Sequence, residues 1–132
     1  MFGRKKKRVV VDFQPAADVG AMVTRLVEKL PLPHIKIESL FFIRSEGSSA
    51  RAYARIWGLS RIFQVAAGFK PTYVIEVISK YYDKLPEEEK IKVLIHELMH
   101  IPKTFSGALK PHRGPHHRIN KREVEKLLEQ MR

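Results

Sequence analysis

The segment that most constrains the fold is residues 86–101, where the residue pattern predicts the longest helix of the chain. Pro86 suits a first helical position, and the glutamates that follow it complement the positive end of the helix dipole. The apolar residues of this segment fall on almost every side of the helix: Ile91, Leu94, Ile95, Leu98, Met99 and Ile101. A helix that is apolar all round must be buried, so other elements have to cover it on several sides.

The rest of the chain supplies those elements as predicted helices and strands. Apolar residues at helical spacing predict a helix over residues 16–30, which Pro31 ends. The other predicted elements are strands over 35–43, 50–57 and 72–78, a hairpin-like turn at 46–49, a short helix over 61–67 capped by Gly68, and a final helix that starts at Asn120. The sequence therefore predicts an α+β fold, in which a small mixed or antiparallel sheet of about three strands packs on helices.

Length and composition bound the class of protein. The 132 residues suit a single domain over residues 13–132, preceded by a basic N-terminal arm over residues 1–12. Cysteine is absent, which excludes disulfides and thiolate ligands. No apolar run approaches the roughly 20 residues of a membrane span, and the first apolar stretch, 9–11, is cut short by Asp12, so we expect no secretory signal peptide. We therefore expect a cytoplasmic protein without a membrane partner.

The formal net charge of +11 suits a polyanionic partner. The basic run 4–8 in the N-terminal arm could contact a nucleic acid, or it could be a solubilising tail without a partner. The strand predicted over 50–57 also places basic and aromatic side chains on one face: Arg51, Tyr53, Arg55 and Trp57. That face suits base stacking and phosphate contacts, unless its aromatic residues pack under a helix and its arginines pair with acids.

The long helix contains a pattern that carries chemistry, because His96, Glu97 and His100 stand in the order H-E-x-x-H. Residues four apart lie one helical turn above each other, so both imidazoles can bind one tetrahedral Zn²⁺. Glu97 lies beside such a metal without binding it, and can act as a general base on a metal-bound water. The metal also gives buried histidines a partner that they would otherwise lack.

A zinc ion that keeps one position open for water needs a third protein ligand. Five of the six histidines lie between His96 and His117, and three of them belong to the loop-like stretch 103–119: His112, His116 and His117. A loop of this length in so small a domain is usually functional or disordered. Spacing alone leaves the choice among the three loop histidines open.

Three segments of the chain are familiar as a set: ARIWG at 54–58, YVIEVIS at 73–79 and, most specifically, VLIHELMHIPKTFSGALKPH at 93–112. From about residue 50 to its C-terminus the chain resembles the small zinc metallopeptidases of archaea and phages, relatives of the SprT-like branch of zincins. The resemblance implies a zincin-like fold, one Zn²⁺ per chain, His96 and His100 as ligands, and Glu97 as the catalytic acid and base. For the third ligand it points to His112, with His116 as the alternative.

Together these observations predict zinc-dependent hydrolysis of a peptide or protein substrate, with Glu97 moving the proton of the activated water. The alternative is a nucleic-acid-binding protein whose zinc is structural, or a zinc-dependent phosphodiesterase. The net charge favours this alternative, whereas Glu97 favours the peptidase, because a closed structural site needs no unligated carboxylate. An inactive zincin scaffold that serves as an interaction protein is the third class.

Overall fold

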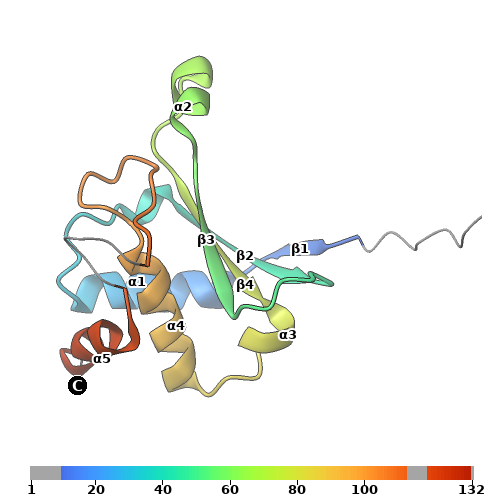
Figure 1. The fold of residues 1–132 in the computed structure, drawn as a ribbon, viewed down its shortest axis with the longest axis vertical. Helices are drawn as coiled ribbons and strands as arrows, with labels where there is room; N and C mark the ends of the chain where they lie inside the picture. Colours follow the sequence, from blue (N-terminus) through green and yellow to red (C-terminus); the bar gives the residue numbers. More distant parts are fainter. Residues whose placement is uncertain (1–9, 113–118, 132) are drawn as a thin grey trace, which may run out of the picture.

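The computed structural model describes residues 10–112 and 119–131, which form a four-stranded sheet with helices packed against it (Figure 1). The elements follow in the order β1 (Asp12–Pro15), α1 (Ala17–Lys29), a 3₁₀ turn (Ile37–Ser39), β2 (Leu40–Glu46), β3 (Ala54–Gly58), α2 (Arg61–Ala67), β4 (Tyr73–Ile78), α3 (Ser79–Tyr82), α4 (Glu87–Met99) and α5 (Lys121–Glu129). This arrangement confirms the α+β class.

The sheet is mixed, with the strand order β1-β2-β4-β3, and it has four strands where three were expected. The predicted hairpin-like connection between β2 and β3 is wrong, because β4 lies between them, parallel to β2 and antiparallel to β3. β4 takes this position because five of its six residues are buried, and a strand buried on both faces stabilises the sheet most at its centre.

β1 is the strand that the sequence analysis did not predict. All of its four residues are exposed, so no alternation of apolar and polar residues marks it in the sequence. It pairs antiparallel with β2 and places Phe13 opposite Ser45. Its first residue, Asp12, belongs to the predicted basic arm, of which residues 1–9 lie outside the described residues.

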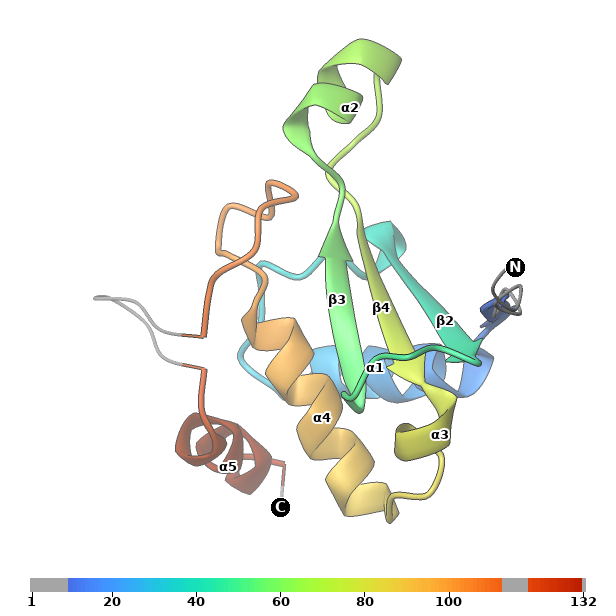
Figure 2. The same ribbon diagram turned by 45° about the vertical axis from the view of Figure 1, so that its right-hand side comes forward.

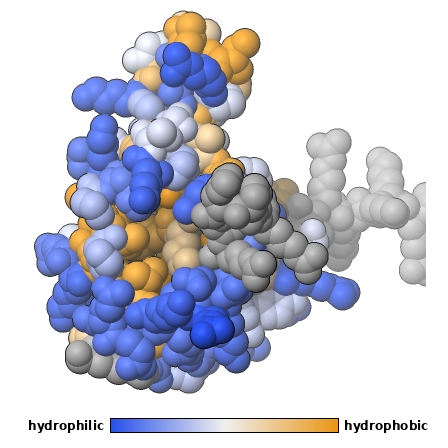
Figure 3. All heavy atoms as spheres, turned by 60° about the vertical axis from the view of Figure 1, so that its left-hand side comes forward, coloured by the Kyte–Doolittle hydropathy of each residue, from blue (hydrophilic) through white to orange (hydrophobic). Residues whose placement is uncertain are grey.

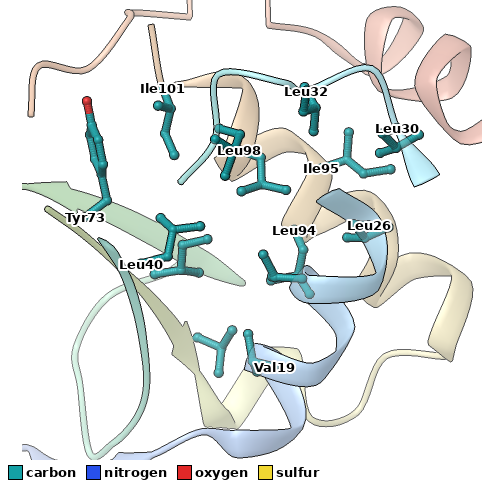
Figure 4. Close-up of a cluster of buried hydrophobic side chains, with 14 of the residues drawn as sticks. Val19, Leu26, Leu30, Leu32, Leu40, Tyr73, Leu94, Ile95, Leu98 and Ile101 are labelled. Carbon is teal, nitrogen blue, oxygen red and sulfur yellow. The ribbon is translucent and has the colours of Figure 1, made fainter. Parts of the chain in front are cut away.

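The core lies between the sheet and the helices α1 and α4. α1 contacts β2 and α4, and α4 contacts β3, so both helices cover the same face of the sheet (Figure 2). Figure 4 shows how side chains from these elements meet there, among them Val19, Leu26, Leu40, Tyr73, Leu94, Ile95 and Leu98. Because one side of α4 packs against β3, α1 and α5, the residues at its C-terminal end are held in a fixed place.

α4 is buried on one side only, which differs from the prediction of a helix covered all round. Leu94, Ile95 and Leu98 are buried, whereas Val93 and His96 are only half-buried. Pro86 precedes the helix rather than opening it. His100 is the first residue after the helix and still has helical backbone angles, so the predicted one-turn spacing from His96 is kept.

Two predicted helix ends are confirmed. Gly68 follows α2 with φ of +71°, the left-handed conformation that glycine adopts without strain. The side chain of Asn120 accepts a hydrogen bond from the backbone N–H of Glu123 at 3.0 Å and so caps α5. Within the part of the chain that the structure describes, no helix is long and apolar enough to cross a membrane.

Candidate metal centre

Three imidazoles from two segments of the chain meet at the C-terminal end of α4. His96 lies in the last turn of the helix, His100 directly follows it, and His112 comes from the loop beyond. One ring nitrogen of each residue lies within 4.8 Å of those of the other two, and the Nε2 atoms of His96 and His112 are 3.1 Å apart. Such a convergence of nitrogen donors can hold a metal ion.

The ring of His100 is oriented by the backbone of the loop. Its Nδ1 atom lies 2.6 Å from the carbonyl oxygen of Lys110, and the N–H of Lys110 donates to the carbonyl oxygen of His100 at 2.7 Å. A carbonyl can only accept, so Nδ1 carries the proton and Nε2 has a free lone pair. A backbone carbonyl bound to the outer nitrogen is the common support of a metal-binding histidine.

The loop that leads to His112 is fastened to β4 and to α2 by two side chains. The hydroxyl of Tyr73, which is fully buried, accepts from the N–H of Gly107 at 2.8 Å and donates to the carbonyl of Ala108 at 2.8 Å. The side-chain amide of Gln64 donates to the carbonyls of Leu59 and Ser106 at 2.7 and 2.9 Å. The segment that carries His112 is therefore held by contacts with β4 and α2 in addition to the bonds between Lys110 and His100 at the end of α4.

Two glycines let the same loop approach the end of β3. A Cβ atom on Gly58 would overlap the carbonyl oxygen of Gly107, so no larger residue fits there without moving the loop. Gly107 itself has φ of +94°, and a Cβ on it would overlap the carbonyl oxygen of Leu59. The backbone of the loop and the end of the strand are thus in direct contact.

Glu97 lies beside the three histidines with its carboxyl group buried. The residue is 5% exposed, and its Oε2 atom has no hydrogen-bond partner among the described residues. Burial raises the pKa of Glu97 to about 8, because the charged form has lost its water without gaining a partner. A native protein rarely leaves a carboxylate in this condition, so the group needs a partner that binds later.

His96 and His100 are neutral at pH 7. Burial lowers the pKa of His96 to about 4, and charge on His100 or His112 would lower it further. Burial also lowers the pKa of His100, although the bond to the carbonyl of Lys110 acts in the opposite direction. A neutral imidazole keeps the lone pair that a metal ion requires, so these two residues can bind a cation without first losing protons.

A cavity of about 800 Å³ opens in front of this cluster. It lies between β3, α4, the segment 109–112 and α5, and His96, Glu97, His100 and His112 line it. Its apolar lining includes Tyr53, Ile56, Val93, Leu109 and Val124. β3 is the last strand of the sheet on this side, and within the described residues no strand pairs with its outer edge. A chain-shaped ligand can therefore reach the cluster along β3.

The predicted basic and aromatic face of β3 is partly occupied by contacts within the protein. Arg55 donates to Glu76 at 2.8 Å, and Trp57 donates to the same carboxyl oxygen at 2.8 Å. Burial by itself would raise the pKa of Glu76, but the hydrogen bonds from Arg55 and other donors outweigh it and lower the pKa. The expected pairing of an arginine with an acid is confirmed, whereas Trp57 is 51% exposed and does not pack under a helix.

The structure thus brings together four of the predicted site residues: His96, Glu97, His100 and His112. His116 and His117, the other candidates for a third ligand, lie outside the described residues. Sequence reasoning missed the supporting groups, namely the backbone of Lys110 and the side chains of Tyr73 and Gln64. The one sequence signal that could have indicated a packed loop is the aromatic Phe105 followed two residues later by Gly107.

Comparisons with known proteins agree with this geometry. A family model described as "Putative phage metallopeptidase" matches residues 11–132. No curated protein and no solved structure matches the chain. The match begins at the residue before β1 and spans all the elements that build the cluster.

Proposed function

Because the chain belongs to the phage metallopeptidase family, we propose that it is a zinc-dependent peptidase whose centre is His96, His100 and His112, with Glu97 as acid and base. One observation carries the proposal. Three imidazoles converge beside a buried carboxyl group whose Oε2 atom has no partner among the described residues. Catalytic zinc sites have three protein ligands and keep a fourth position open for water. A carboxylate that lies beside the metal without binding it suits such a site.

The residues present fit a zinc ion. Two nitrogens bound to one tetrahedral zinc at the usual bond length stand roughly 3.3 Å apart. The Nε2 atoms of His96 and His112 are already 3.1 Å apart, so these two side chains need little movement to share an ion. Neutral imidazole suits zinc better than it suits magnesium or calcium, which prefer oxygen ligands. The likeness of residues 93–112 to SprT-like zinc enzymes supports the same ion.

Zinc held by the three histidines would supply a Lewis acid for the scissile carbonyl and would make a nearby water more acidic. Glu97 accepts the proton of that water on a carboxylate oxygen and returns it to the leaving amine. The pKa of Glu97 is about 8 without metal, and a cation beside the carboxyl group lowers this pKa toward neutral pH. The carbonyl of Lys110 holds the ring of His100 in place throughout.

The substrate binds as an extended chain along β3 in this proposal. The outer edge of β3 borders the cavity, and its backbone groups can pair with a peptide as an added strand. A peptide in that position lies in front of Glu97 and the histidines. The apolar lining at Val93, Val124 and Leu109 favours a substrate with an apolar side chain near the bond that is cut.

The alternative of a structural zinc, or of phosphodiester hydrolysis, has less support. A closed structural site would leave the buried carboxyl of Glu97 without a role. Arg55, which was a candidate for phosphate contacts, is paired with Glu76. No observation on the described residues favours the nucleic-acid alternative, and the basic run of the arm lies outside them.

The test pairs Glu97→Gln with Glu87→Gln, a control on the exposed first turn of the same helix. Both variants should bind one zinc per chain, measured by elemental analysis after dialysis. Only Glu97→Gln should lose hydrolysis of a casein substrate, by roughly a hundredfold or more. Turnover by Glu97→Gln at the wild-type rate would refute the assignment of Glu97, and absence of zinc uptake by the wild type would refute the metal.

A further inference from the structure

α2 presents an apolar surface to solvent at one end of the molecule. β3 leads into this helix and the segment before β4 leads out of it, so α2 stands beyond the sheet and apart from the other helices (Figures 1 and 2). Four large apolar side chains there are 74%, 61%, 70% and 58% exposed: Ile62, Phe63, Val65 and Phe69. We call these four residues the α2 tip. Apolar residues exposed one at a time are ordinary, but a cluster of this size marks an interaction surface.

The polarity of α2 is the reverse of that expected for a helix on a protein surface. Its one buried residue is polar, because Gln64 points inward and donates to the carbonyls of Leu59 and Ser106. The apolar residues point outward instead. A surface helix normally buries its apolar side in the core. The apolar residues of the α2 tip therefore add nothing to the core, and no element among the described residues covers them.

The surroundings of the α2 tip are positively charged. Arg61 and Lys70 flank it, and the sequence contains no aspartate or glutamate from residue 47 to residue 75. The loop that Gln64 contacts belongs to a second stretch, 98–122, which also lacks acidic residues and contributes Lys103 and Lys110. In Figure 3 the apolar side chains gather at the α2 end of the molecule beside hydrophilic ones. A partner for this end must accept apolar groups and also be negatively charged.

We propose that the α2 tip inserts into the surface of an anionic phospholipid bilayer. The apolar side chains would enter the boundary between headgroups and acyl chains, while Arg61 and Lys70 would contact the lipid phosphates. Such binding is peripheral and needs no membrane-spanning segment. The sequence analysis expected no membrane partner because the chain has no such segment, and this proposal departs from that expectation. The proposal does not depend on the metal centre or on peptidase activity.

Other partners fit the α2 tip less well. A nucleic acid would attract Arg61 and Lys70 but offers little to four apolar side chains. A second copy of the chain would bring like charges together. A seven-residue helix is also only about 10 Å long, too short to bury the roughly 800 Å² per partner of a stable dimer.

The experiment measures binding of the full chain to two kinds of vesicle by sedimentation. One kind consists of phosphatidylcholine, and the other of phosphatidylcholine and phosphatidylglycerol in equal amounts. We expect binding to the anionic vesicles only, and weaker binding as salt is added. Phe63→Ser and Phe69→Ser should each lower the partition coefficient by about tenfold, because each removes one inserted aromatic ring.

The matched control is Phe13→Ser. Phe13 is 55% exposed, close to the value for Phe69, but lies on β1 at another part of the surface (Figure 1). This variant should bind anionic vesicles as the wild type does. All three replaced side chains are exposed, so the variants should melt at the wild-type temperature, and a melting curve checks this.

A reporter variant tests insertion directly. Trp57 is the only tryptophan, so Phe63→Trp in a Trp57→Phe background places the sole indole in the α2 tip. Its emission should shift to shorter wavelength with anionic vesicles and stay unchanged with phosphatidylcholine. If Phe63→Ser and Phe69→Ser bound anionic vesicles as strongly as the wild type, the binding would depend on the basic side chains alone, and the proposal would be overturned. A dimer or a DNA complex that these variants abolish, without vesicle binding, would also overturn it.

Discussion

The hydroxyl of Tyr73 accepts the backbone N–H of Gly107 at 2.8 Å, and this bond joins the central strand of the sheet to the loop that carries His112. The ring of Tyr73 also packs edge-on against Phe105, with ring centroids 4.9 Å apart. Both contacts are made by a fully buried residue. The position of the third imidazole therefore depends on a strand residue that is far from the cluster in the sequence.

Replacing Tyr73 by phenylalanine should loosen that loop while keeping the core filled. The variant leaves the buried N–H of Gly107 without its acceptor, which should lower the free energy of unfolding by about 1–3 kcal/mol. Zinc affinity should fall by about tenfold, because His112 is held less firmly. Tyr82→Phe, at another buried tyrosine, is the control and should leave zinc affinity unchanged. Zinc titration and urea unfolding measure both effects; equal zinc affinity in the two variants would contradict the role of Tyr73.

Gly58→Ala should disturb the same loop from the side of β3. The added Cβ would overlap the carbonyl oxygen of Gly107, so the loop or the strand end must move, at a cost of about 1–3 kcal/mol in the free energy of unfolding. Gly20→Ala in α1 is the comparison. Its Cβ would lie 3.1 Å from the ring of Phe42, and the better helix propensity of alanine offsets that contact. Thermal melts should therefore show a clear loss for Gly58→Ala alone.

His112→Ala should weaken zinc binding by roughly a hundredfold or more, since it removes one of three ligands. His116→Ala and His117→Ala should have little effect. Competition with a chelator of known zinc affinity ranks the three variants. If His116→Ala caused the largest loss instead, the third ligand would be His116, and small losses in all three would mean that the ligand is another residue.

The stability of the metal-free protein should depend on pH through Glu97. Its pKa is about 8 in the folded protein and near 4.5 when unfolded, so folding takes up a proton between these values. The contribution of Glu97 is therefore full below pH 4.5 and is lost as the pH rises through 8. Glu97→Gln cannot ionise, so it should be more stable than the wild type at pH 7, by about 3 kcal/mol. Unfolding of both proteins in chelator across this range tests the difference, which should vanish near pH 4.5.

The sequence predicted the parts of the site that lie close together in the chain. His96, Glu97 and His100 fall within one turn and a half of a helix, and local helix geometry alone places them together. It also predicted α2 and its cap, since Gly68 suits a left-handed residue. His112 was expected from a family resemblance, and its meeting with the other two histidines agrees with that expectation.

The other features of the fold and the site depend on contacts between residues far apart in the sequence, and the spacing of apolar residues does not predict such contacts. β4 lies between β2 and β3 because other elements cover both of its faces, and this depends on the whole fold rather than on the residues of β4. β1 has no apolar face, so nothing in its four residues marked it as a strand. The hydrogen bond from His100 is accepted by the backbone carbonyl of Lys110. Every residue has such a carbonyl, so the sequence does not single this one out.

The order of strands in the sheet has a consequence for how the protein is made. β2 and β3 leave the ribosome before β4, yet β4 separates them in the sheet. Until residue 78 has emerged, β2 can pair only with β1, and β3 has none of the described strands to pair with. His112 follows still later, and Tyr73 can place its loop only once both are free of the exit tunnel. A metal centre therefore cannot assemble on a half-made chain, and a product that stops before residue 112 has at most two of the three imidazoles.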